Sequence, residues 1–393
     1  LGLIGTSRGL SVAQEFRAAG HEIRSVCDVD ATRRQKAQQE LDASQAHADF
    51  RRLLDDAVID AVIVATPDHW HAPAAILALD AGKHVYVEKP CAHNIREGRQ
   101  LIEAAERTRK VVQVGTQSRS TPVLRQAIQQ LHDGVIGDIK LAKAWNSQRR
   151  ANIGHAEPSD PPAGFDYELW VGPAPKPAFQ KNCHHYTWHW WYDFGTGDVG
   201  NDGVHELDVA RWGLGLWQQP HRVAVVGGKY FFDDDQQFPD TVTAAFEFHG
   251  EQGVKKQIVF EMRLWSTNYP EGVDNGLEFL GTEGRMFISR RGKFALLGPR
   301  NQRLEQRPDQ PPRWDVSQHL RGWLDAIRGT GTLTAPATEA HLSASLCHLA
   351  NIAYRVDHTV HFDADQETFP SDDAASALLT RPDRGEWTVP SEV

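Results

Sequence analysis

The chain has 393 residues, and because a single hydrophobic core stops growing at roughly 250 to 300 residues, two domains are expected. Lys and Arg number 42 against 52 Asp and Glu, a net charge of -10, and the sequence has no basic cluster suited to a phosphate backbone, which excludes nucleic acid as a partner. It also has no run of about 18 apolar residues, which excludes a membrane-spanning helix.

The first 119 residues alternate short apolar runs with amphipathic stretches, a pattern typical of βαβ units and a parallel sheet. Strands buried on both faces are predicted over residues 1–5, 23–27, 61–65, 84–87 and 111–115. Covering helices are predicted over residues 32–41, 71–80 and 96–108. Residues 1–119 are therefore expected to form a Rossmann-like, doubly wound dinucleotide-binding domain.

Residues 120–365 show the strict alternation of a one-sided antiparallel sheet. One predicted strand carries its apolar face on Val242, Ala244, Phe246 and Phe248. Residues 281–284 separate two further strands as a hairpin turn does. Apolar stripes at helical spacing predict helices at 320–327 and 342–349, which pack on the sheet or on the first domain. The region is expected to be an α+β substrate domain with an open, largely antiparallel sheet.

Two stretches lack this periodicity. Residues 146–200 are rich in Pro, Gly, Trp and His, and loops of this length in compact domains are usually functional. Residues 366–393 are polar and punctuated by proline, so they are expected to pack on the surface as a tail. The cysteines lie too far apart for a zinc site or a disulfide scaffold and are expected to be reduced thiols: Cys27, Cys91, Cys183 and Cys347.

The first strand runs into a helix through a turn of mostly small residues. This turn, Gly5, Thr6, Ser7 and Arg8, lets backbone N–H groups approach a pyrophosphate. Ser7 takes the place of the second glycine of a GxGxxG fingerprint, so a plain strand-to-helix connection is the alternative. The position of the turn, after the first strand of a βαβ unit, favours dinucleotide binding.

Asp28 ends the second strand, where a carboxylate can accept hydrogen bonds from the adenosine ribose. Capping the following helix is its alternative role. An acidic residue at this position repels a 2′-phosphate and favours NAD, whereas Arg33 and Arg34 leave NADP as the less favoured cofactor.

Two neighbouring strands end in polar residues at the sheet edge where ligands bind. Thr66 and Pro67 follow one strand, and Glu88-Lys89-Pro90 follows the next. Lys89 follows a buried strand directly and is held extended by the proline after it, so it is not expected to be a free surface charge. It is therefore the leading functional candidate. A solvated lysine paired with a nearby acid is the alternative.

The second domain adds a histidine and an aromatic segment. Asn201 and His205 are four residues apart in a predicted helix, which places them on one face; a core histidine is the alternative. Residues 183–191 offer aromatic faces for sugar C–H groups and imidazoles for hydroxyls, with a packed aromatic loop as the alternative. No carboxylate or cysteine spacing supports a metal site.

These motifs together resemble the glucose-fructose oxidoreductase / inositol dehydrogenase / MocA (Gfo/Idh/MocA) family, and the resemblance spans most of the chain. The motifs are Glu88-Lys89-Pro90, Gly203-x-His205-x-x-Asp208, Thr66-Pro67 with His71, residues 113–117, residues 170–173 and residues 279–284.

The resemblance implies a nicotinamide close to Thr66 and Pro67, sugar chemistry, and a homo-oligomer, dimer or tetramer, formed through the C-terminal sheet. The expected cofactor-binding set is Gly5, Thr6, Ser7, Arg8, Asp28, Thr66, Pro67, His71, Glu88, Lys89 and Gln117. Family members commonly carry an aspartate four residues before the histidine. This sequence has Asn201 there and Asp202 one residue later, a departure from the usual Lys-Asp-His arrangement.

The expected activity is oxidation of a secondary hydroxyl of a sugar, glycoside or polyol by hydride transfer to nicotinamide, which requires a base and a positive group beside the developing alkoxide. We assign the base to His205 and the positive group to Lys89, while Asn201 can orient a hydroxyl but cannot accept a proton. Substrate contacts are expected from Arg149, His189, Asp202 and His205.

Two other functions fit the same residues. An NAD-dependent glycosidase acts by transient oxidation, elimination and re-reduction, and releases its leaving group without net NADH. A non-catalytic dinucleotide-binding sensor keeps the first domain but has lost its chemistry at Asn201. The protein is expected to be cytoplasmic, or periplasmic if an export signal preceded Leu1.

Overall fold

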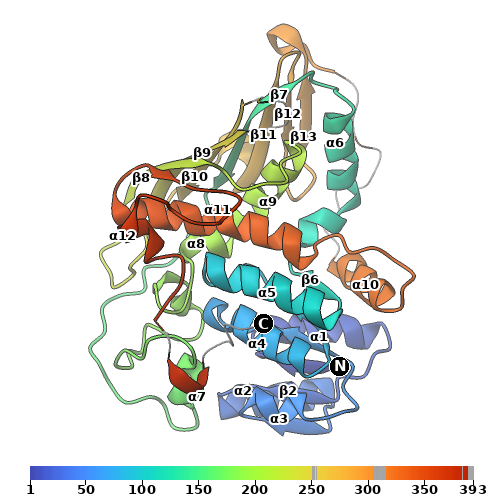
Figure 1. The fold of residues 1–393 in the computed structure, drawn as a ribbon, viewed down its shortest axis with the longest axis vertical. Helices are drawn as coiled ribbons and strands as arrows, with labels where there is room; N and C mark the ends of the chain where they lie inside the picture. The colour runs from blue at the N-terminus through green and yellow to red at the C-terminus, as the bar shows by residue number, and fades with distance from the viewer. Residues whose placement is uncertain (250–252, 254, 305–307, 309–315, 383, 388–393) are drawn as a thin grey trace.

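The computed structural model describes residues 1–249, 253, 255–304, 308, 316–382 and 384–387. Two sheets, each covered by helices, lie one above the other along the long axis of the molecule (Figure 1). The first is formed by the N-terminal part of the chain and the second by strands that begin at Ile139. No helix in the described ranges is long and apolar enough to cross a bilayer.

The first sheet has six parallel strands in the order β3-β2-β1-β4-β5-β6. The strands are β1 (Gly2–Ile4), β2 (Ser25–Cys27), β3 (Gln45–His47), β4 (Ala61–Val64), β5 (His84–Val87) and β6 (Val112–Val114). The helices between them are α1 (Arg8–Ala18), α2 (Ala31–Leu41), α3 (Phe50–Leu54), α4 (Asp68–Asp80) and α5 (Ile95–Thr108). The strand order reverses beside β1, and this reversal creates the crevice in which such sheets bind ligands.

Alternate residues of β4 show how both faces of this sheet are buried. Val62 and Val64 belong to the apolar core formed with α4 and α5. Ile63 belongs to the core on the other face, together with Phe16 of α1 and Trp323. The predicted Rossmann-like sheet is thus confirmed, although β3 was not predicted because its Gln-Ala-His sequence carries no apolar signal.

The second sheet is mixed, with eight strands in the order β13-β12-β11-β7-β10-β9-β8-β14. Only β7 and β10 pair in parallel among the described strands of this sheet. The strands are β7 (Ile139–Asn146), β8 (Arg222–Gly228), β9 (Thr241–His249), β10 (Lys255–Arg263), β11 (Asn275–Gly281), β12 (Arg285–Ile288), β13 (Phe294–Leu297) and β14 (Val360–His361). The predicted alternation in β9 and the hairpin between β11 and β12 are both confirmed.

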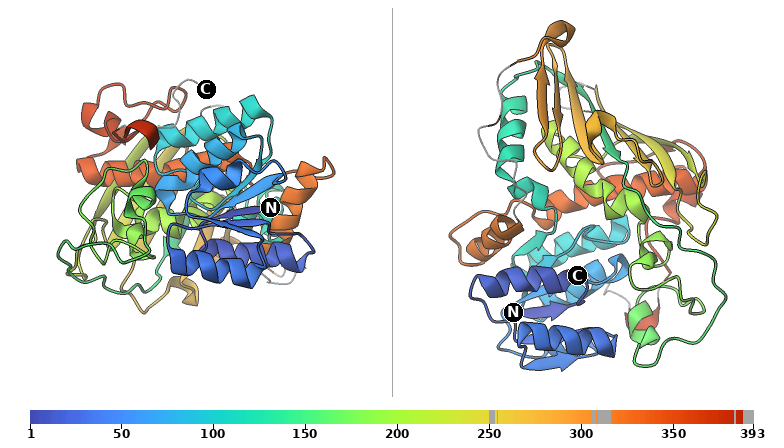
Figure 2. Two further views of the ribbon diagram at one scale, coloured as in Figure 1. Left: turned by 90° about the horizontal axis from the view of Figure 1, so that it is seen from below. Right: turned by 180° about the vertical axis from the view of Figure 1, so that it is seen from behind.

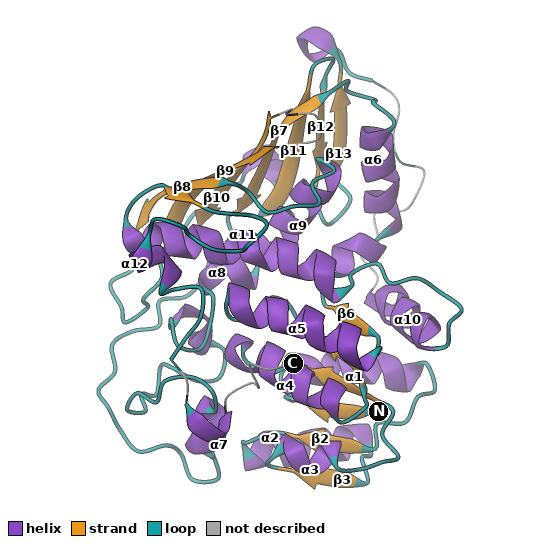
Figure 3. Cartoon of the chain, in the orientation of Figure 1, coloured by secondary structure: helices purple, strands orange, loops and turns teal. Residues whose placement is uncertain are grey.

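Further helices lie on the second sheet and between the two sheets (Figures 2 and 3). They are α6 (Pro122–His132), α8 (Gly197–Asn201), α9 (Gly203–Gly213), α10 (Val316–Ile327), α11 (Ala337–Val356) and α12 (Asp373–Ser376). α10 lies on the first sheet, where the Trp323 ring packs edge-on against Phe16 at 5.6 Å. α11 contacts α5 on one side and α9 and β8 on the other, so it ties the second sheet to the first.

Residues 147–196, which we call the arm, leave the second sheet and pass along the first domain. The arm contains α7 (Tyr167–Val171) and the short 3-10 helix η2 (Thr187–Trp190). The Ala31 amide donates to the Gly164 carbonyl at 2.9 Å, and the Asp166 amide donates to the Val29 carbonyl at 3.2 Å. An aromatic cluster around Phe165 and Trp170 stiffens the arm.

The remaining described 3-10 helices are η1 (Gln117–Ser120), η4 (Pro270–Gly272), η5 (Pro299–Asn301) and η6 (Gly385–Trp387). The last of these lies in the tail, whose described residues contact both domains. Phe369 is buried in the core of the second domain. Trp387 packs edge-on against Trp70 of α4 at 5.6 Å. The described part of the tail therefore contributes apolar side chains to the packing of both domains.

Candidate active site

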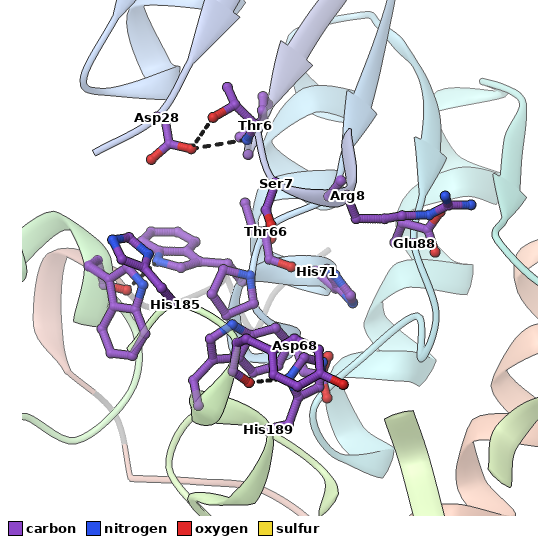
Figure 4. A pocket seen from close by; sticks show the side chains of 18 of the residues that line it. Thr6, Ser7, Arg8, Asp28, Thr66, Asp68, His71, Glu88, His185 and His189 are labelled. Atoms are coloured by element: carbon purple, nitrogen blue, oxygen red, sulfur yellow. Dashed lines mark hydrogen bonds and ion pairs between the residues drawn. The ribbon is translucent and has the colours of Figure 1, made fainter. Parts of the chain in front are cut away.

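One cavity of about 440 Å³ begins at the carboxyl ends of β1, β4 and β5 and extends to α8 and α9. Figure 4 shows part of its lining, with Asp28 and Thr6 at one end and Asp68 and His189 at the other. The predicted site residues that line it are Gly5, Thr6, Ser7, Arg8, Asp28, Thr66, Pro67, His71, Glu88, Lys89, Gln117, His189, Asn201, Asp202 and His205. The structure thus collects side chains from both domains in one place.

The first turn needs glycine at position 5. Gly5 has φ +86°, and a Cβ there would lie 2.4 Å from the Ala65 carbonyl oxygen. This close approach brings the β1 turn against the end of β4, and the chain then enters α1 through Ser7, whose side chain makes no capping hydrogen bond. The first N–H groups of α1 are the kind of donors that bind a pyrophosphate.

Asp28 holds this turn and does not cap a helix. Its Oδ2 accepts hydrogen bonds from Thr6 N at 3.0 Å and Thr6 Oγ1 at 2.6 Å. The cap of α2 is instead Asp30, which accepts from the amides of Thr32 and Arg33. The capping alternative for Asp28 is therefore wrong, and its carboxylate stands at the cavity wall as expected for a ribose-binding acid.

Thr66 and His71 form the wall at the end of β4. Thr66 Oγ1 is buried and has no hydrogen-bond partner among the described residues. The His71 ring lies between two backbone carbonyls, with Nδ1 2.6 Å from Pro90 O and Nε2 2.9 Å from Thr66 O. Burial lowers the His71 pKa to about 4, so the ring is neutral and serves to position these strand ends.

Glu88 and Gln117 line the cavity beside the start of α1. Arg8 Nε lies 3.5 Å from Glu88 Oε1, and Gln117 Nε2 donates to Tyr86 Oη at 3.0 Å. A Cβ at Gly115 would approach Glu88 Oε2 to 2.7 Å. The glycine after β6 thus leaves room for the Glu88 carboxylate.

Lys89 is held by Asn201. Lys89 Nζ donates to the Asn201 backbone carbonyl and, at 3.2 Å, to its Oδ1. Asn201 Nδ2 in turn donates to Asp198 Oδ1 at 2.9 Å, which fixes the amide. The ammonium is therefore directed toward the second domain and is not a free surface charge.

Asn201 and His205 do not share one continuous helix. α8 ends at Asn201, Asp202 is the residue before α9, and α9 begins at Gly203. The prediction that a single helix carries both residues is therefore wrong, because the chain turns at Asp202. Both side chains nevertheless reach the same cavity.

His205 is buried and its Nδ1 has no hydrogen-bond partner among the described residues. Burial, followed by the charges of Arg290 and Lys89, lowers the His205 pKa well below its usual value. The imidazole is therefore neutral at physiological pH and can accept a proton.

Arg290 is a site residue that the sequence did not indicate. It follows β12, and its guanidinium bridges Asp202 Oδ1 at 2.8 Å and the buried Glu206 Oε1 at 2.6 Å. Although burial favours the neutral acid, Arg290 and then His205 lower the Asp202 pKa to about 2. Asp202 is thus an anion fixed by Arg290, and Asn275 Nδ2 donates to its second oxygen at 3.2 Å.

Arg149 lies outside the cavity, and Arg150 lines it. Arg149 is exposed. Arg150 contacts Asp198 through Nε at 2.7 Å and Nη2 at 2.8 Å, and its Nη1 donates to Tyr186 Oη at 3.1 Å. Neighbouring side chains of an extended chain point to opposite sides. The sequence alone does not say which of the two consecutive arginines faces the cavity.

The aromatic segment also reaches the cavity. The His189 ring stacks on Trp188 with centroids 3.6 Å apart, and burial lowers the His189 pKa to about 3. His185 Nε2 lies 2.9 Å from Asp30 Oδ2, a contact between the arm and the first domain. In the described part of the chain no group of three or more His, Cys, Asp or Glu side chains is placed to hold a metal ion.

Comparisons with known proteins identify the family of both parts of the chain. Residues 1–116 match the family model "Oxidoreductase family, NAD-binding Rossmann fold", and residues 143–389 match "Oxidoreductase family, C-terminal alpha/beta domain". Inositol 2-dehydrogenase 2 of Saccharopolyspora erythraea is 32% identical over 363 residues, which cover 88% of this chain and 90% of that protein.

Two further relatives are more distant or match over a shorter length. Levoglucosan dehydrogenase of Pseudarthrobacter phenanthrenivorans is 30% identical over 168 residues, 43% of this chain and only 36% of that protein. The WlbA dehydrogenase of Bordetella pertussis, solved with NADH and UDP-GlcNAcA, shares the fold with a TM-score of 0.70 and 18% identity, over 93% of this chain and 98% of that chain. With both domains matched, the chain belongs to the Gfo/Idh/MocA family of NAD-binding oxidoreductases.

Proposed function

We propose that the protein oxidises a secondary hydroxyl group of a sugar, glycoside or polyol, with NAD as the oxidant. The observation that supports this most directly is that the Lys89 ammonium, held by Asn201, and the neutral His205 imidazole line the same cavity as the NAD-binding turn. A cation and a neutral base beside one hydroxyl are what alcohol oxidation requires.

The residues present fit NAD. The first amides of α1 would donate to the pyrophosphate, the Asp28 carboxylate at the cavity wall would accept from a ribose hydroxyl, and Thr66 Oγ1 is a buried hydroxyl without a hydrogen-bond partner among the described residues. NAD, when bound, supplies the acceptor for the hydrogen that leaves the carbinol carbon. Glu88 and Gln117 line the same cavity.

The protein side chains then divide the remaining work. Lys89 stabilises the negative charge that develops on the substrate oxygen. His205, which lines the cavity, accepts the hydroxyl proton. Asn201 keeps the ammonium in position and cannot itself take a proton.

A polyhydroxylated substrate suits the other side of the cavity. Trp188 and Tyr186 present aromatic faces, while Gln148, His189 and the Arg150 guanidinium present polar groups. Inositol and levoglucosan, named in the relatives' descriptions, are the first compounds to test.

The test is a panel of sugars, polyols and aryl glycosides with NAD, in which NADH absorbance and aglycone release are read together. Lys89→Ala and His205→Ala are each expected to lower kcat by about a hundredfold or more, with NAD binding nearly unchanged. Lys36→Ala, an exposed lysine on α2, is the matched control. Full rates in either cavity variant would refute the assignment, and aglycone release without NADH would favour the glycosidase.

A further inference from the structure

Asp68 is a buried carboxyl group of the cavity that the proposed mechanism does not use. It is the first residue of α4 and only 1% exposed, yet it lines the cavity together with Lys89 and His189. Its Oδ2 accepts a hydrogen bond from Thr196 Oγ1 at 2.6 Å. Figure 4 shows it at the end of the view away from the NAD-binding turn.

Thr196 connects this carboxyl to a second cavity of about 170 Å³. The polar residues in its lining include His93, Asp193, Thr196, His348, Arg355 and Arg381. His348 Nε2 and Arg381 Nη1 are buried and without hydrogen-bond partners among the described residues. The space is large enough for water molecules, and its unpaired polar atoms are the groups that hold buried water.

The Thr196 position is fixed from the other side by α11. Asn351 Nδ2 donates to the Thr196 backbone carbonyl at 2.8 Å. Thr196 is 2% exposed; its hydroxyl donates to Asp68, and the residue also lines the second cavity. A hydroxyl can accept one proton while it donates another, which is what a proton relay requires.

The proposed oxidation needs a final acceptor for one proton. Oxidation breaks the O–H and C–H bonds of the carbinol, forms the C=O bond, sends the hydrogen of the C–H bond with its electron pair to NAD, and releases one proton. His205 can accept that proton only briefly, because burial and the charges of Arg290 and Lys89 hold its pKa far below neutrality. Burial raises the Asp68 pKa to about 7, against the opposing effects of Thr196 and Lys89.

We propose that Asp68 receives the proton released by substrate oxidation and that Thr196 passes it to the second cavity. This inference rests on the proposed dehydrogenase activity. The carboxylate oxygen takes the proton, the Asp68 O–H then gives it to Thr196 Oγ, and Thr196 releases its own hydroxyl proton into the second cavity. Among the described residues, Lys89 at the end of β5 lowers the pKa of Asp68, and Asp68 in turn raises the pKa of Cys347 of α11.

The first test needs no substrate. Infrared difference spectra of the NAD-loaded protein are recorded across the pH range, and the C=O stretch of a protonated carboxylic acid is followed. A band that titrates near neutrality and disappears in Asp68→Asn is expected. Thr196→Val removes the hydrogen bond that favours the carboxylate and should move the midpoint to higher pH, whereas Thr196→Ser should keep it. If Asp68→Asn removes no titrating band, the proposal is overturned.

The second test measures NADH formation against pH. Because Asp68 must be ionised to accept a proton, the wild-type rate should rise with pH around 7. Asp68→Asn should lose that rise and about tenfold or more of kcat at about pH 8, with KM less affected. Thr196→Val should show a smaller loss and Thr196→Ser nearly none. Unchanged kcat and pH profile in Asp68→Asn would overturn the proposal.

The two tests separate this inference from the proposed function. If the wild-type protein reduces no NAD with any member of the panel, the proposed function fails and the infrared titration alone decides whether Asp68 carries an exchangeable proton set by Thr196. If NADH forms and no titrating carboxyl is found, the dehydrogenase stands and the proton route is wrong.

Discussion

Asp208 belongs to a motif that resembles a catalytic signature, but its contacts are those of a structural ion pair. Arg119 Nη2 lies 2.9 Å from Asp208 Oδ1, and the side chains are 5% and 0% exposed. Ser343 Oγ donates to the same oxygen at 2.6 Å. The pair lies between η1, α9 and α11, where the two domains meet, and is absent from the lining of the active cavity.

Asp208→Asn is expected to destabilise the fold by about 3–5 kcal/mol, because it leaves a buried guanidinium without its main counter-charge. Urea unfolding followed by tryptophan fluorescence measures this loss. Glu157→Gln, at an exposed acid of the arm, is the control and should change stability by less than about 0.5 kcal/mol. Wild-type stability with lost turnover in Asp208→Asn would show that the residue acts in chemistry instead.

Residues that follow strands were the easiest to predict. Lys89 and Thr66 reach the cavity because the carboxyl ends of parallel strands meet at one edge, a rule that the sequence pattern is sufficient to apply. Arg290 and Asp68 were not identified. Arg290 reaches Asp202 only because β12 pairs with β11 and turns back toward α9, and no local pattern encodes that pairing.

At the scale of elements, apolar periodicity was sufficient to predict helices and strands that bury one face in the core. The alternation in β9 and the stripe in α10 both correspond to core residues. Periodicity failed for β3, a half-buried strand of three residues, and for the break between α8 and α9. Short polar elements are fixed by their neighbours, so their own sequence carries little information about them.

Helix α10 gives the clearest element-scale prediction. It lies outside the first domain in sequence, yet Trp323 is fully buried against the first sheet, near Phe16 and Tyr86. Trp323→Ala is expected to cost about 3–5 kcal/mol and to lower the stability of the NAD-binding domain, because it leaves a cavity in that core. Thermal unfolding with and without NAD measures this effect.

Arg321→Ala, on the exposed face of the same helix, is the control and should unfold like the wild type. If Trp323→Ala also unfolded like the wild type, α10 would not be part of the core of the first domain.

At the scale of the whole molecule, the tail returns to join helices of both domains. The Glu367 carboxylate accepts hydrogen bonds from Nε and Nη2 of Arg99 in α5, at 3.1 and 2.9 Å. Nε2 of His341 in α11 lies 2.6 Å from Glu367 Oε1. Burial opposes ionisation, but the hydrogen bonds from His341 and Arg99 prevail and lower the Glu367 pKa from 4.5 to about 2. One carboxylate thus joins three segments that are far apart in sequence.

This contact makes stability depend on pH in a defined direction. A carboxyl whose pKa is lower in the folded chain stabilises it above the pKa of the unfolded chain, and the contribution is lost as the pH falls from about 5 to about 2. The shift corresponds to up to about 3 kcal/mol at neutral pH. Glu367→Gln should therefore be less stable than the wild type at pH 7, and the difference should shrink toward zero near pH 2.

Urea unfolding of both proteins at a series of pH values measures that difference, with Asp365→Asn, an exposed acid two residues away, as the control. A difference that stayed constant across the whole range would mean that the shape of the side chain holds the tail in place. A stability difference that decreases as the pH falls would mean that the charge of Glu367 holds the tail in place. The geometry favours the second outcome, because both Glu367 oxygens accept hydrogen bonds from Arg99, a donor that stays charged throughout the titration.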